Sequence, residues 1–572
     1  MKKIVCFTIL AILLSLTACS QKEIADVVVY ADSIYTSNAN EDFVEAFAVK
    51  DGKYIAVGKK DDIKKYVGGK TKLYEQKFVM SGGIESHGHW ILNEAFKLGL
   101  YISPLKADGK VKNFTDILNE IIAYKAKNPS QNGIYGYGFD ITINNDGFDL
   151  GTFDREFPDI PVFISESSLH GAIANTKCFE LAGVLTEDKD GILIDRDDMG
   201  RPIGICRDEA CTYIRNKIFG ALLPQEQYQQ AVKNAAKSLN ANGYVMHYDA
   251  WSNFDGTEEM YKAISAVDKA GELDFLYSSA YCIESFEKNK IDEMISKAVE
   301  LKNAYTSSHY KPNMLKLFAD GVAEAGTAYI SGHYNTGEDD HGTQIWDNAT
   351  MTSIVNKANR SGLTVHVHTM GDAAVKEAVD AFIDANKNYG YVRNSIAHVA
   401  LINDEELRKI KEYDLAVTSG ANWASQISQD EIEETKYFVN EDVFRKFYPY
   451  KEYIDYGIKA ALHTDNPCSP GILNIFGYIQ VMLDGWDHSK PINEKMFPRR
   501  TGKFITVKDA INMFTINGAW MNNLENERGS IEVGKYADFI FADKDPFKQS
   551  SDKVWEVNLL KTFFEGKEVY NR

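Results

Sequence analysis

Short apolar runs alternate with longer segments of helical period through the middle of the chain. The runs are rich in β-branched and aromatic residues, which predicts buried parallel strands joined by crossover helices. Eight runs fit this pattern, the number that a (β/α)8 barrel needs. They read GGIESHGH, GYVMHYDA, DFLYSSAYC, NMLKLFADG, LTVHVHTMGD, NSIAHVAL, LAVTSGANW and KAALHTDNP. The pattern therefore predicts an α/β fold built on a TIM-type barrel.

The two ends of the chain have a different pattern, with apolar runs broken by Gly, Asp and Pro. Near the start, Asp51-Gly52 is typical of a two-residue β-hairpin turn. Similar runs return at the end, in GSIEVGKYADFIFADKDP and VNLLKTFFEGKEVYN. We therefore expect residues 24–80 and 525–572 to form one β-sandwich lobe, and residues 81–524 to form the barrel.

An unusually long segment, residues 100–225, separates the first two predicted barrel strands. It contains the strand-like run IPVFISESSLHGAIA and the Gly-Pro-rich piece DGILIDRDDMGRPIGI. Insertions of this size on the catalytic face of a barrel more often form a lid or a pocket wall than a spacer. We expect this segment to be an inserted lid or substrate segment.

The chain begins with MKKIVCFTILAILLSLTACS. Lys2 and Lys3 precede an apolar stretch that is too short to span a membrane, and small residues follow it, as in an export signal. The LTAC tetrapeptide resembles a bacterial lipoprotein processing site, which implies that residues 1–18 are removed and Cys19 is lipidated. An ordinary secretory signal is the alternative. We expect an exported chain, on the periplasmic or cell-surface side, whose only membrane contact is a lipid anchor at Cys19.

Composition and charge narrow the class of protein. The chain has 572 residues, 44% of them apolar, so a large folded core is expected and disorder is not. The net charge of −19 is spread along the chain, which argues against nucleic acid as a partner. The seven cysteines include no Cys-x-x-Cys pair, so we expect those beyond Cys19 to be packing cysteines. The sequence does not indicate an oligomeric state.

Six of the 12 histidines fall at the ends of four predicted strands. His87 and His89 are one residue apart, and residues i and i+2 of a strand point to the same face. His366 and His368 repeat this spacing. Two further strands end in His398 and in His463-Thr464-Asp465. Because barrels carry their chemistry at these strand ends, imidazoles with a carboxylate predict a metal site, with zinc favoured over iron, manganese or nickel.

Lys316 lies within the apolar run NMLKLFADG. A buried amine is costly to charge, so it tends to be neutral and nucleophilic and can take up carbon dioxide as a carbamate. The alternative is an ion pair with Asp320 or Glu324.

The order His-x-His, Lys, His, His, Asp on successive strands resembles the amidohydrolase superfamily with a two-metal centre. LKLFADGVAEAGTA, HTMGDAAV, HTDNP and TINGAWMNNLENERGSIEVGKYADFIFADKDP look like its YtcJ-like branch, which includes N-substituted formamide deformylases. PVFISESSLHGAIANTKCFELAGV resembles the insertion of that branch. The similarity runs from about Val27 to the C-terminus.

The resemblance implies two divalent metal ions, zinc being favoured. His87 and His89 would bind one ion, and carbamylated Lys316 would bridge to a second ion bound by His368 and His398. Asp465 would bind metal and move protons. His366 and His463 would lie one layer deeper, as buried and hydrogen-bonded histidines. His170 in the insertion and Trp423 are candidate contacts to the substrate, against the alternatives of a surface histidine and a packing aromatic.

The implied reaction is hydrolysis of a C–N bond in an N-acyl, N-formyl or cyclic amide. A metal-bound hydroxide would attack the carbonyl, and Asp465 would serve as acid and base. Two alternatives stay open: a one-metal deaminase or C–O bond hydrolase on the same fold, and a catalytically inactive solute-binding lipoprotein. The expected partner of the enzyme is a small-molecule amide.

Two positions depart from the family pattern. The first strand usually reads Pro-Gly-Phe-Ile-Asp before its histidines, whereas here it reads Ser81-Gly82-Gly83-Ile84-Glu85. The strand ending in His398 usually has Glu before the histidine, whereas here it has Ala397. Neither change removes a ligand, so we expect them to act on the surroundings of the ligands.

Overall fold

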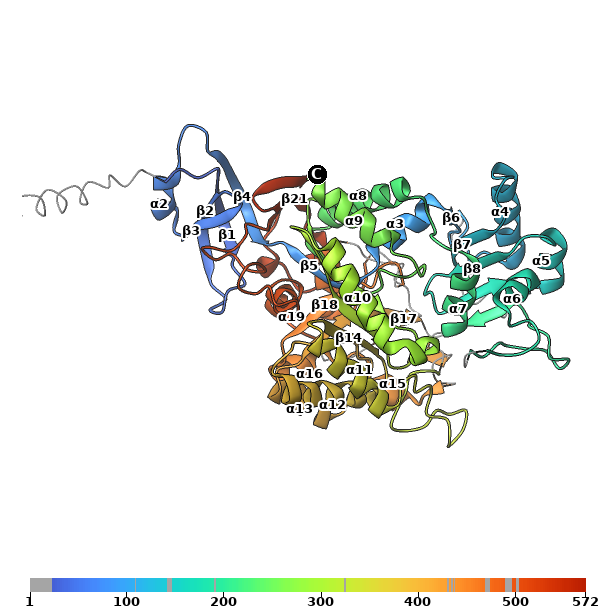
Figure 1. Cartoon of the computed structure of the whole chain (residues 1–572). Coiled ribbons are helices and arrows are strands. Elements are labelled where there is room, and N and C mark those ends of the chain that lie inside the picture. Colours follow the sequence, from blue (N-terminus) through green and yellow to red (C-terminus); the bar gives the residue numbers. More distant parts are fainter. Residues whose placement is uncertain are drawn as a thin grey trace, which may run out of the picture.

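A computed structural model of the chain (Figure 1) describes residues 23–107, 110–140, 147–189, 192–323, 326–428, 432–433, 436, 438–468, 474–488, 496–499 and 504–572. The predicted export signal, with Cys19, lies outside these residues, as does Glu324. Within the described ranges, no helix is both long enough and apolar enough to cross a membrane.

The predicted barrel is the central feature of the fold. All eight predicted runs form strands of one parallel sheet. In spatial order these are β5 (Gly83–Gly88), β11 (Tyr244–Asp249), β12 (Leu276–Cys282), β13 (Tyr310–Phe318), β14 (Thr364–Thr369), β15 (Ser395–His398), β16 (Ala416–Gly420) and β18 (Ala460–His463). The prediction of a TIM-type barrel is confirmed.

The first and last strands of the barrel meet just beyond their C-terminal ends. There the backbone N–H of Asp465 donates to the carbonyl of His87 at 3.2 Å, and that of His89 donates to the carbonyl of Asn466 at 2.7 Å. Deeper in the barrel, the Ser86 hydroxyl donates to the carbonyl of Leu462 at 2.5 Å. These bonds nearly close the barrel and bring the ends of β5 and β18 side by side.

Amphipathic helices cover the outside of the barrel. In α8, Tyr228, Val232, Ala235 and Leu239 recur at helical spacing and are buried, and burying a side chain of the size of Leu239 stabilises by about 1.5–3 kcal/mol. The main helices are α3 (Trp90–Leu98), α8 (Gln225–Ala241), α9 (Glu259–Lys269), α10 (Ile291–Tyr305), α11 (Asn348–Arg360), α12 (Asp372–Tyr389), α13 (Asp404–Glu412), α16 (Tyr450–Asp455), α17 (Ile475–Asp484), α18 (Val507–Phe514) and α19 (Ile516–Met521).

The insertion after β5 has a sheet and an apolar core of its own. Its sheet contains β6 (Leu100–Tyr101), β7 (Ile134–Phe139), β8 (Val162–Glu166), β9 (Gly171–Ala174) and β10 (Ile205–Arg207). Its helices are α4 (Phe114–Lys127), α5 (Leu150–Glu156), α6 (Thr176–Ala182) and α7 (Glu209–Ile218). Asn113 and Asp116 begin α4 by exchanging side-chain and backbone hydrogen bonds as a capping box. In Figure 1 the insertion and the N-terminal strands lie on opposite sides of the barrel.

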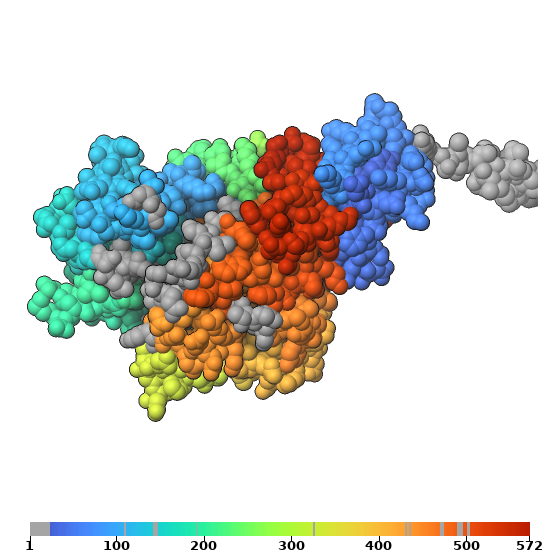
Figure 2. Space-filling view, turned by 180° about the vertical axis from the view of Figure 1, so that it is seen from behind, coloured from blue at the N-terminus to red at the C-terminus, as the bar shows by residue number. Residues whose placement is uncertain are grey.

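Both ends of the chain build one seven-stranded sheet. Its order is β22 (Lys567–Asn571), β21 (Leu559–Phe564), β20 (Phe539–Ala542), β4 (Lys72–Ser81), β1 (Val27–Tyr35), β2 (Phe43–Lys50) and β3 (Lys53–Gly58). The Asp51-Gly52 turn joins β2 to β3, and both of its residues have positive φ, as the predicted hairpin turn requires. Figure 2 shows the C-terminal strands between the N-terminal strands and the rest of the molecule.

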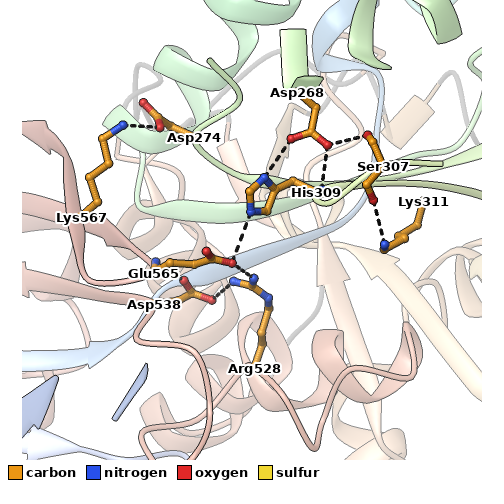
Figure 3. Close-up of polar contacts among 9 residues, drawn as sticks. All are labelled: Asp268, Asp274, Ser307, His309, Lys311, Arg528, Asp538, Glu565 and Lys567. Atoms are coloured by element: carbon orange, nitrogen blue, oxygen red, sulfur yellow. Dashed lines mark hydrogen bonds and ion pairs between the residues drawn. The ribbon is translucent and has the colours of Figure 1, made fainter. Parts of the chain in front are cut away.

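Ion pairs between charged side chains join this terminal sheet to the barrel, in a seam shown in Figure 3. His309 lies just before β13, with Nδ1 2.9 Å from an oxygen of Asp268 in α9 and Nε2 3.5 Å from an oxygen of Glu565 in the β21–β22 turn. The guanidinium of Arg528 pairs with Glu565 and, at 2.5 Å, with the buried Asp538. This seam lies at the N-terminal end of β13, away from the strand ends that carry the predicted site.

Candidate metal centre

Six side chains predicted as ligands converge at the C-terminal end of the barrel. They are His87 and His89 at the end of β5, Lys316 in β13, His368 in β14, His398 at the end of β15 and Asp465 after β18. All six are buried. Nε2 of His87 and Nε2 of His89 lie 3.4 Å and 3.6 Å from Oδ1 of Asp465. The ring centroid of His398 lies 4.6 Å from those of His87 and His368.

The donor atoms at this centre fit a metal ion. Ligand atoms of His87, His398 and Asp465 all lie within 4.8 Å of one another. Nδ1 of His398 and Oδ1 of Asp465 are buried, and neither has a hydrogen-bond partner among the described residues. Buried polar atoms are costly without a partner, and a coordinated cation would supply one. Imidazoles with a carboxylate are ligands that zinc accepts.

The backbone is unusual at two of these residues. His398 has a φ of 74° and Asp465 a φ of 54°, in the left-handed region that side chains other than glycine seldom adopt. Such a conformation costs on the order of 1–3 kcal/mol, and it persists where the surrounding structure enforces it. The structure keeps this conformation at two of the predicted metal ligands.

Lys316 is enclosed by the barrel and only 1% exposed. Its Nζ lies 4.7 Å from the ring centroid of Phe318, and burial lowers the pKa of the amine to about 8. In the described part of the chain, no carboxylate lies within ion-pair distance of Lys316. Asp320 instead accepts backbone N–H groups, including those of Gly371 at 2.7 Å and Tyr329 at 2.9 Å. Burial of Lys316 thus makes its neutral, nucleophilic form easier to reach than for an exposed lysine.

Three of the surrounding imidazoles have a lowered pKa. Burial, followed by the charge of Lys316, places the pKa of His87 and His368 well below the ordinary range. Burial and the neighbouring histidines do the same for His398. Neutral imidazole is the form that binds metals.

A second layer of side chains orients His87. Its Nδ1 lies 2.7 Å from Nε2 of His366, whose Nδ1 lies 2.6 Å from the Ser395 hydroxyl. This chain of contacts turns Nε2 of His87 toward Asp465. His463 is also buried near His87, but in the described structure neither of its ring nitrogens has a hydrogen-bond partner. The expectation of a hydrogen-bonded histidine thus matches the surroundings of His366 and not those of His463.

A comparison with protein families agrees with this geometry. The profile described as the amidohydrolase family matches residues 75–570. The chain belongs to the amidohydrolase family. The predicted resemblance is confirmed, and this amidohydrolase is a metal-dependent hydrolase acting on C–N bonds.

Individual relatives of this amidohydrolase match almost end to end. YtcJ of Bacillus subtilis is 24% identical over 554 residues, which cover 94% of this chain and 98% of that protein. The N-substituted formamide deformylase of Arthrobacter pascens is 22% identical, covering 96% of this chain and 99% of that protein. An uncharacterized metal-dependent hydrolase from Pyrococcus horikoshii superimposes with a TM-score of 0.69 at 22% identity, covering 92% of this chain and 99% of that one. These likenesses support the fold of the amidohydrolase from end to end.

The two departures from the family pattern have different surroundings in this amidohydrolase. The buried carboxylate of Glu85 accepts the backbone N–H groups of Thr464 at 3.0 Å and His87 at 3.3 Å, and the indole N–H of Trp90 at 3.4 Å. Ala397 offers only a buried methyl group beside His398. Glu85 therefore ties together the two strand ends that carry His87 and Asp465.

The predicted substrate contacts lie near the histidines of the amidohydrolase centre. His170, between β8 and β9 of the insertion, has its ring centroid 6.0 Å from that of His368. Its Nδ1 lies 2.8 Å from Asp208, which raises the pKa of His170 against the opposing effect of burial. The Trp423 ring centroid lies 5.0 Å from that of His398. Both residues are thus near the centre, one from the insertion and one from the barrel.

Sequence reasoning missed two polar residues of the amidohydrolase centre. Asp249, the last residue of β11, lies with Oδ1 3.6 Å from Nδ1 of His89. The strand-end rule that selected the other candidates could have selected it. Cys468, taken for a packing residue, lies in a group with His89 and Asp465 whose ligand atoms are all within 4.8 Å of one another.

Proposed function

We propose that this amidohydrolase cleaves the C–N bond of an N-acyl, N-formyl or cyclic amide, with two divalent metal ions, of which zinc suits the donors best. The observation that carries the proposal is the convergence of four buried imidazoles, one buried amine and one carboxylate at the barrel's C-terminal end. The relationship to an N-substituted formamide deformylase supports an amide as substrate.

The two halves of the centre have different donors. His87 and His89 would hold one ion, and His368 and His398 the other. In its neutral form, the amine of Lys316 would add to carbon dioxide and release one proton, and the resulting carbamate would help to hold both ions. Divalent ions bound there would activate a water and polarise the substrate carbonyl.

Asp465 is proposed to transfer the proton. Its Oδ1 faces the Nε2 atoms of His87 and His89, which places the carboxylate beside the proposed metal ligands. With one oxygen on a metal ion, the carboxylate would use its other oxygen to accept a proton from the attacking water and return it to the leaving nitrogen. General acid-base help of this kind is typically worth about 10²–10⁴-fold in rate.

His170 and Trp423 are proposed to contact the substrate. Asp208 bonds to Nδ1 of His170, which leaves Nε2 for another partner. Phe318 lies 5.1 Å from His368 and 5.3 Å from Trp251, centroid to centroid, and adds apolar surface near Lys316. An apolar or aromatic acyl or amine group would suit these surroundings.

The proposed setting of the enzyme is outside the cytoplasm. Lipidation at Cys19 would hold the folded chain beside a bacterial membrane, where it could act on small amides arriving from outside. Labelling with a radioactive or clickable fatty acid tests this, because a Cys19→Ser variant should lose the label.

The test of the proposed function combines metal content with product formation. The purified chain should bind close to two zinc ions and release amine from at least one member of a panel of N-acyl, N-formyl and cyclic amides. A ratio near one ion per chain would favour the one-metal alternative, and metal without turnover on the whole panel would remove the assigned reaction.

Lys316→Ala tests the bridging role within this experiment. The variant should lose at least one ion per chain and amide hydrolysis together. Lys311→Ala is the matched control, because Lys311 is in the same strand but bonds to the carbonyl of Ser307 at 2.9 Å. If Lys316→Ala kept both metal and activity, the bridging role would be wrong.

A further inference from the structure

Cys468 follows Asp465 by three residues, in the loop after β18. Its sulfur, one carboxylate oxygen of Asp465 and one ring nitrogen of His89 all lie within 4.8 Å of one another. These are three donors of the kinds that bind zinc: a thiol, a carboxylate and an imidazole. The loop thus brings a sulfur to the half of the centre that contains His89.

The other described cysteines have different surroundings. Cys178, Cys206 and Cys211 are buried in the apolar core of the insertion. Cys282 is buried in the barrel core, with its sulfur 3.4 Å from an oxygen of Glu284. Cys468 is only partly buried, at the edge of a group of unpaired polar atoms. Cys468 borders the apolar core of the barrel, and among the described cysteines it is the one whose sulfur also lies in a group of candidate metal ligands.

Asp465 is a second and independent sign of a ligand at this position. Its side chain is 92% buried, and in the described structure no hydrogen-bond donor reaches its Oδ1. The nearest polar neighbours of that oxygen are the Nε2 atoms of His87 and His89, at 3.4 Å and 3.6 Å. A cation between these groups would pair with the oxygen.

The backbone fixes the thiol relative to His89. The N–H of His89 donates to the carbonyl of Asn466 at 2.7 Å, two residues before Cys468. The N–H of Thr464, on the other side of Asp465, donates to the Glu85 carboxylate of β5 at 3.0 Å. The end of β5 and the loop after β18 are thus joined on both sides of Asp465, so this approach of the three donors is part of the fold.

We propose that Cys468 is a sulfur ligand of the metal ion held by His89 and Asp465. On binding, the Sγ–H bond breaks, a sulfur lone pair joins the cation, and the proton leaves to solvent. A thiolate favours zinc over the harder ions manganese and magnesium, so Cys468 would make this half of the centre zinc-selective. The inference rests on the metal centre of the proposed function and adds a ligand to it.

Cobalt absorption tests the inference on the full chain. Loaded with Co²⁺, the unaltered protein should show the near-ultraviolet thiolate-to-cobalt charge-transfer band. Cys468→Ser should lose this band while still binding cobalt through its imidazoles, and its affinity for zinc should fall by more than about tenfold. Cys282→Ser, a buried cysteine of the barrel core, should keep the band.

Alkylation of the unaltered protein gives a second measurement that needs no variant. At alkaline pH, iodoacetamide should modify Cys468 faster in the metal-free protein than in the zinc-bound protein, as followed by mass spectrometry of the peptide containing Cys468. Metal bound at full ratio, with no charge-transfer band and no protection of Cys468, would overturn this inference alone. A failure to bind any metal would overturn both the inference and the proposed function.

Discussion

The carboxylate of Glu85 accepts a hydrogen bond from the backbone N–H of Thr464 at 3.0 Å, and so joins the first barrel strand to the last. The same carboxylate accepts the N–H of His87 at 3.3 Å. Thr464 is the residue before Asp465. One buried side chain therefore holds two backbone segments that carry predicted metal ligands.

Glu85→Ala should weaken both the fold and the metal centre. It leaves the buried N–H of Thr464 without its acceptor, which should lower the free energy of unfolding by about 1–3 kcal/mol. The loosened ends of β5 and β18 should lower metal affinity by about 10–100-fold. Urea unfolding of the metal-free protein and zinc titration measure the two effects.

Glu85→Gln is the matched control for this prediction. The amide keeps an acceptor oxygen at the same distance from the backbone, so its losses should be smaller than those of Glu85→Ala. If Glu85→Ala unfolded and bound zinc like the unaltered chain, Glu85 would have no role in joining the strands.

The barrel and most of its centre could be predicted from the sequence because their signals are local. Each barrel strand is a short apolar run, and a histidine, lysine or aspartate marks the end where parallel strands converge. The sequence could not predict contacts that depend on how distant strands meet. The bond between Glu85 and Thr464 and the approach of Cys468 to His89 both need the closure of β5 against β18.

The insertion was harder to predict for the same reason. The run IPVFISESSLHGAIA has the composition of one strand, but it forms two antiparallel strands, β8 and β9, with His170 in the turn. The nearby Tyr135 and Tyr137 belong to β7 in the same sheet. Their pairing with β8 depends on the insertion's own core, which no local pattern encodes.

Ser395→Ala should weaken metal binding indirectly, because Ser395 contacts His366 and His366 contacts the metal ligand His87. The Ser395 hydroxyl lies 2.6 Å from Nδ1 of His366, whose Nε2 lies 2.7 Å from Nδ1 of His87. Without the hydroxyl, His366 loses the contact that orients its ring, so His87 should hold metal less firmly. We expect zinc affinity to fall by about 10–100-fold, while the free energy of unfolding of the metal-free chain changes by about 1 kcal/mol.

Ser265→Ala is the control for Ser395→Ala. Ser265 is buried in α9, and its hydroxyl has no hydrogen-bond partner among the described residues. This variant removes the same atom from another buried site and should bind zinc normally. Equal zinc affinities for the two variants would show that Ser395 does not act through His366.

His309→Gln should remove the part of the pH dependence of the free energy of unfolding that comes from His309, in the seam between the barrel and the terminal sheet. The hydrogen bond to Glu565, then Asp268 against the effect of burial, raises the pKa of His309. Arg528 lies on the far side of Glu565 and stays charged. The stability gained from protonated His309 is fully present below the unfolded pKa of about 6.5 and is lost as the pH rises through the higher folded value.

Urea unfolding between about pH 5.5 and 9 measures this effect. His309→Gln should be less stable than the unaltered chain by about 1 kcal/mol at the acidic end, and the difference should shrink toward the alkaline end. His333→Gln, which changes an exposed histidine away from the seam, is the matched control. A difference between His309→Gln and the unaltered chain that did not vary with pH would contradict the role of the protonated ring.

Arg528→Met should destabilise the chain more than a change of surface charge, because Arg528 pairs with a carboxylate that is almost fully buried. Asp538 is 2% exposed, and its oxygen lies 2.5 Å from the guanidinium. Removing one partner of a buried pair leaves an uncompensated charge, which costs about 3–5 kcal/mol. Adding Asp538→Asn should recover part of this loss, since the amide keeps the acceptor that the backbone N–H of Glu565 uses at 2.8 Å.

Lys451→Met is the control, because it changes an exposed ion pair with Asp455. It should change the free energy of unfolding by no more than about 0.5 kcal/mol. Urea unfolding measures all three variants, and a loss in Arg528→Met as small as that in Lys451→Met would show that the buried pair does not stabilise the seam.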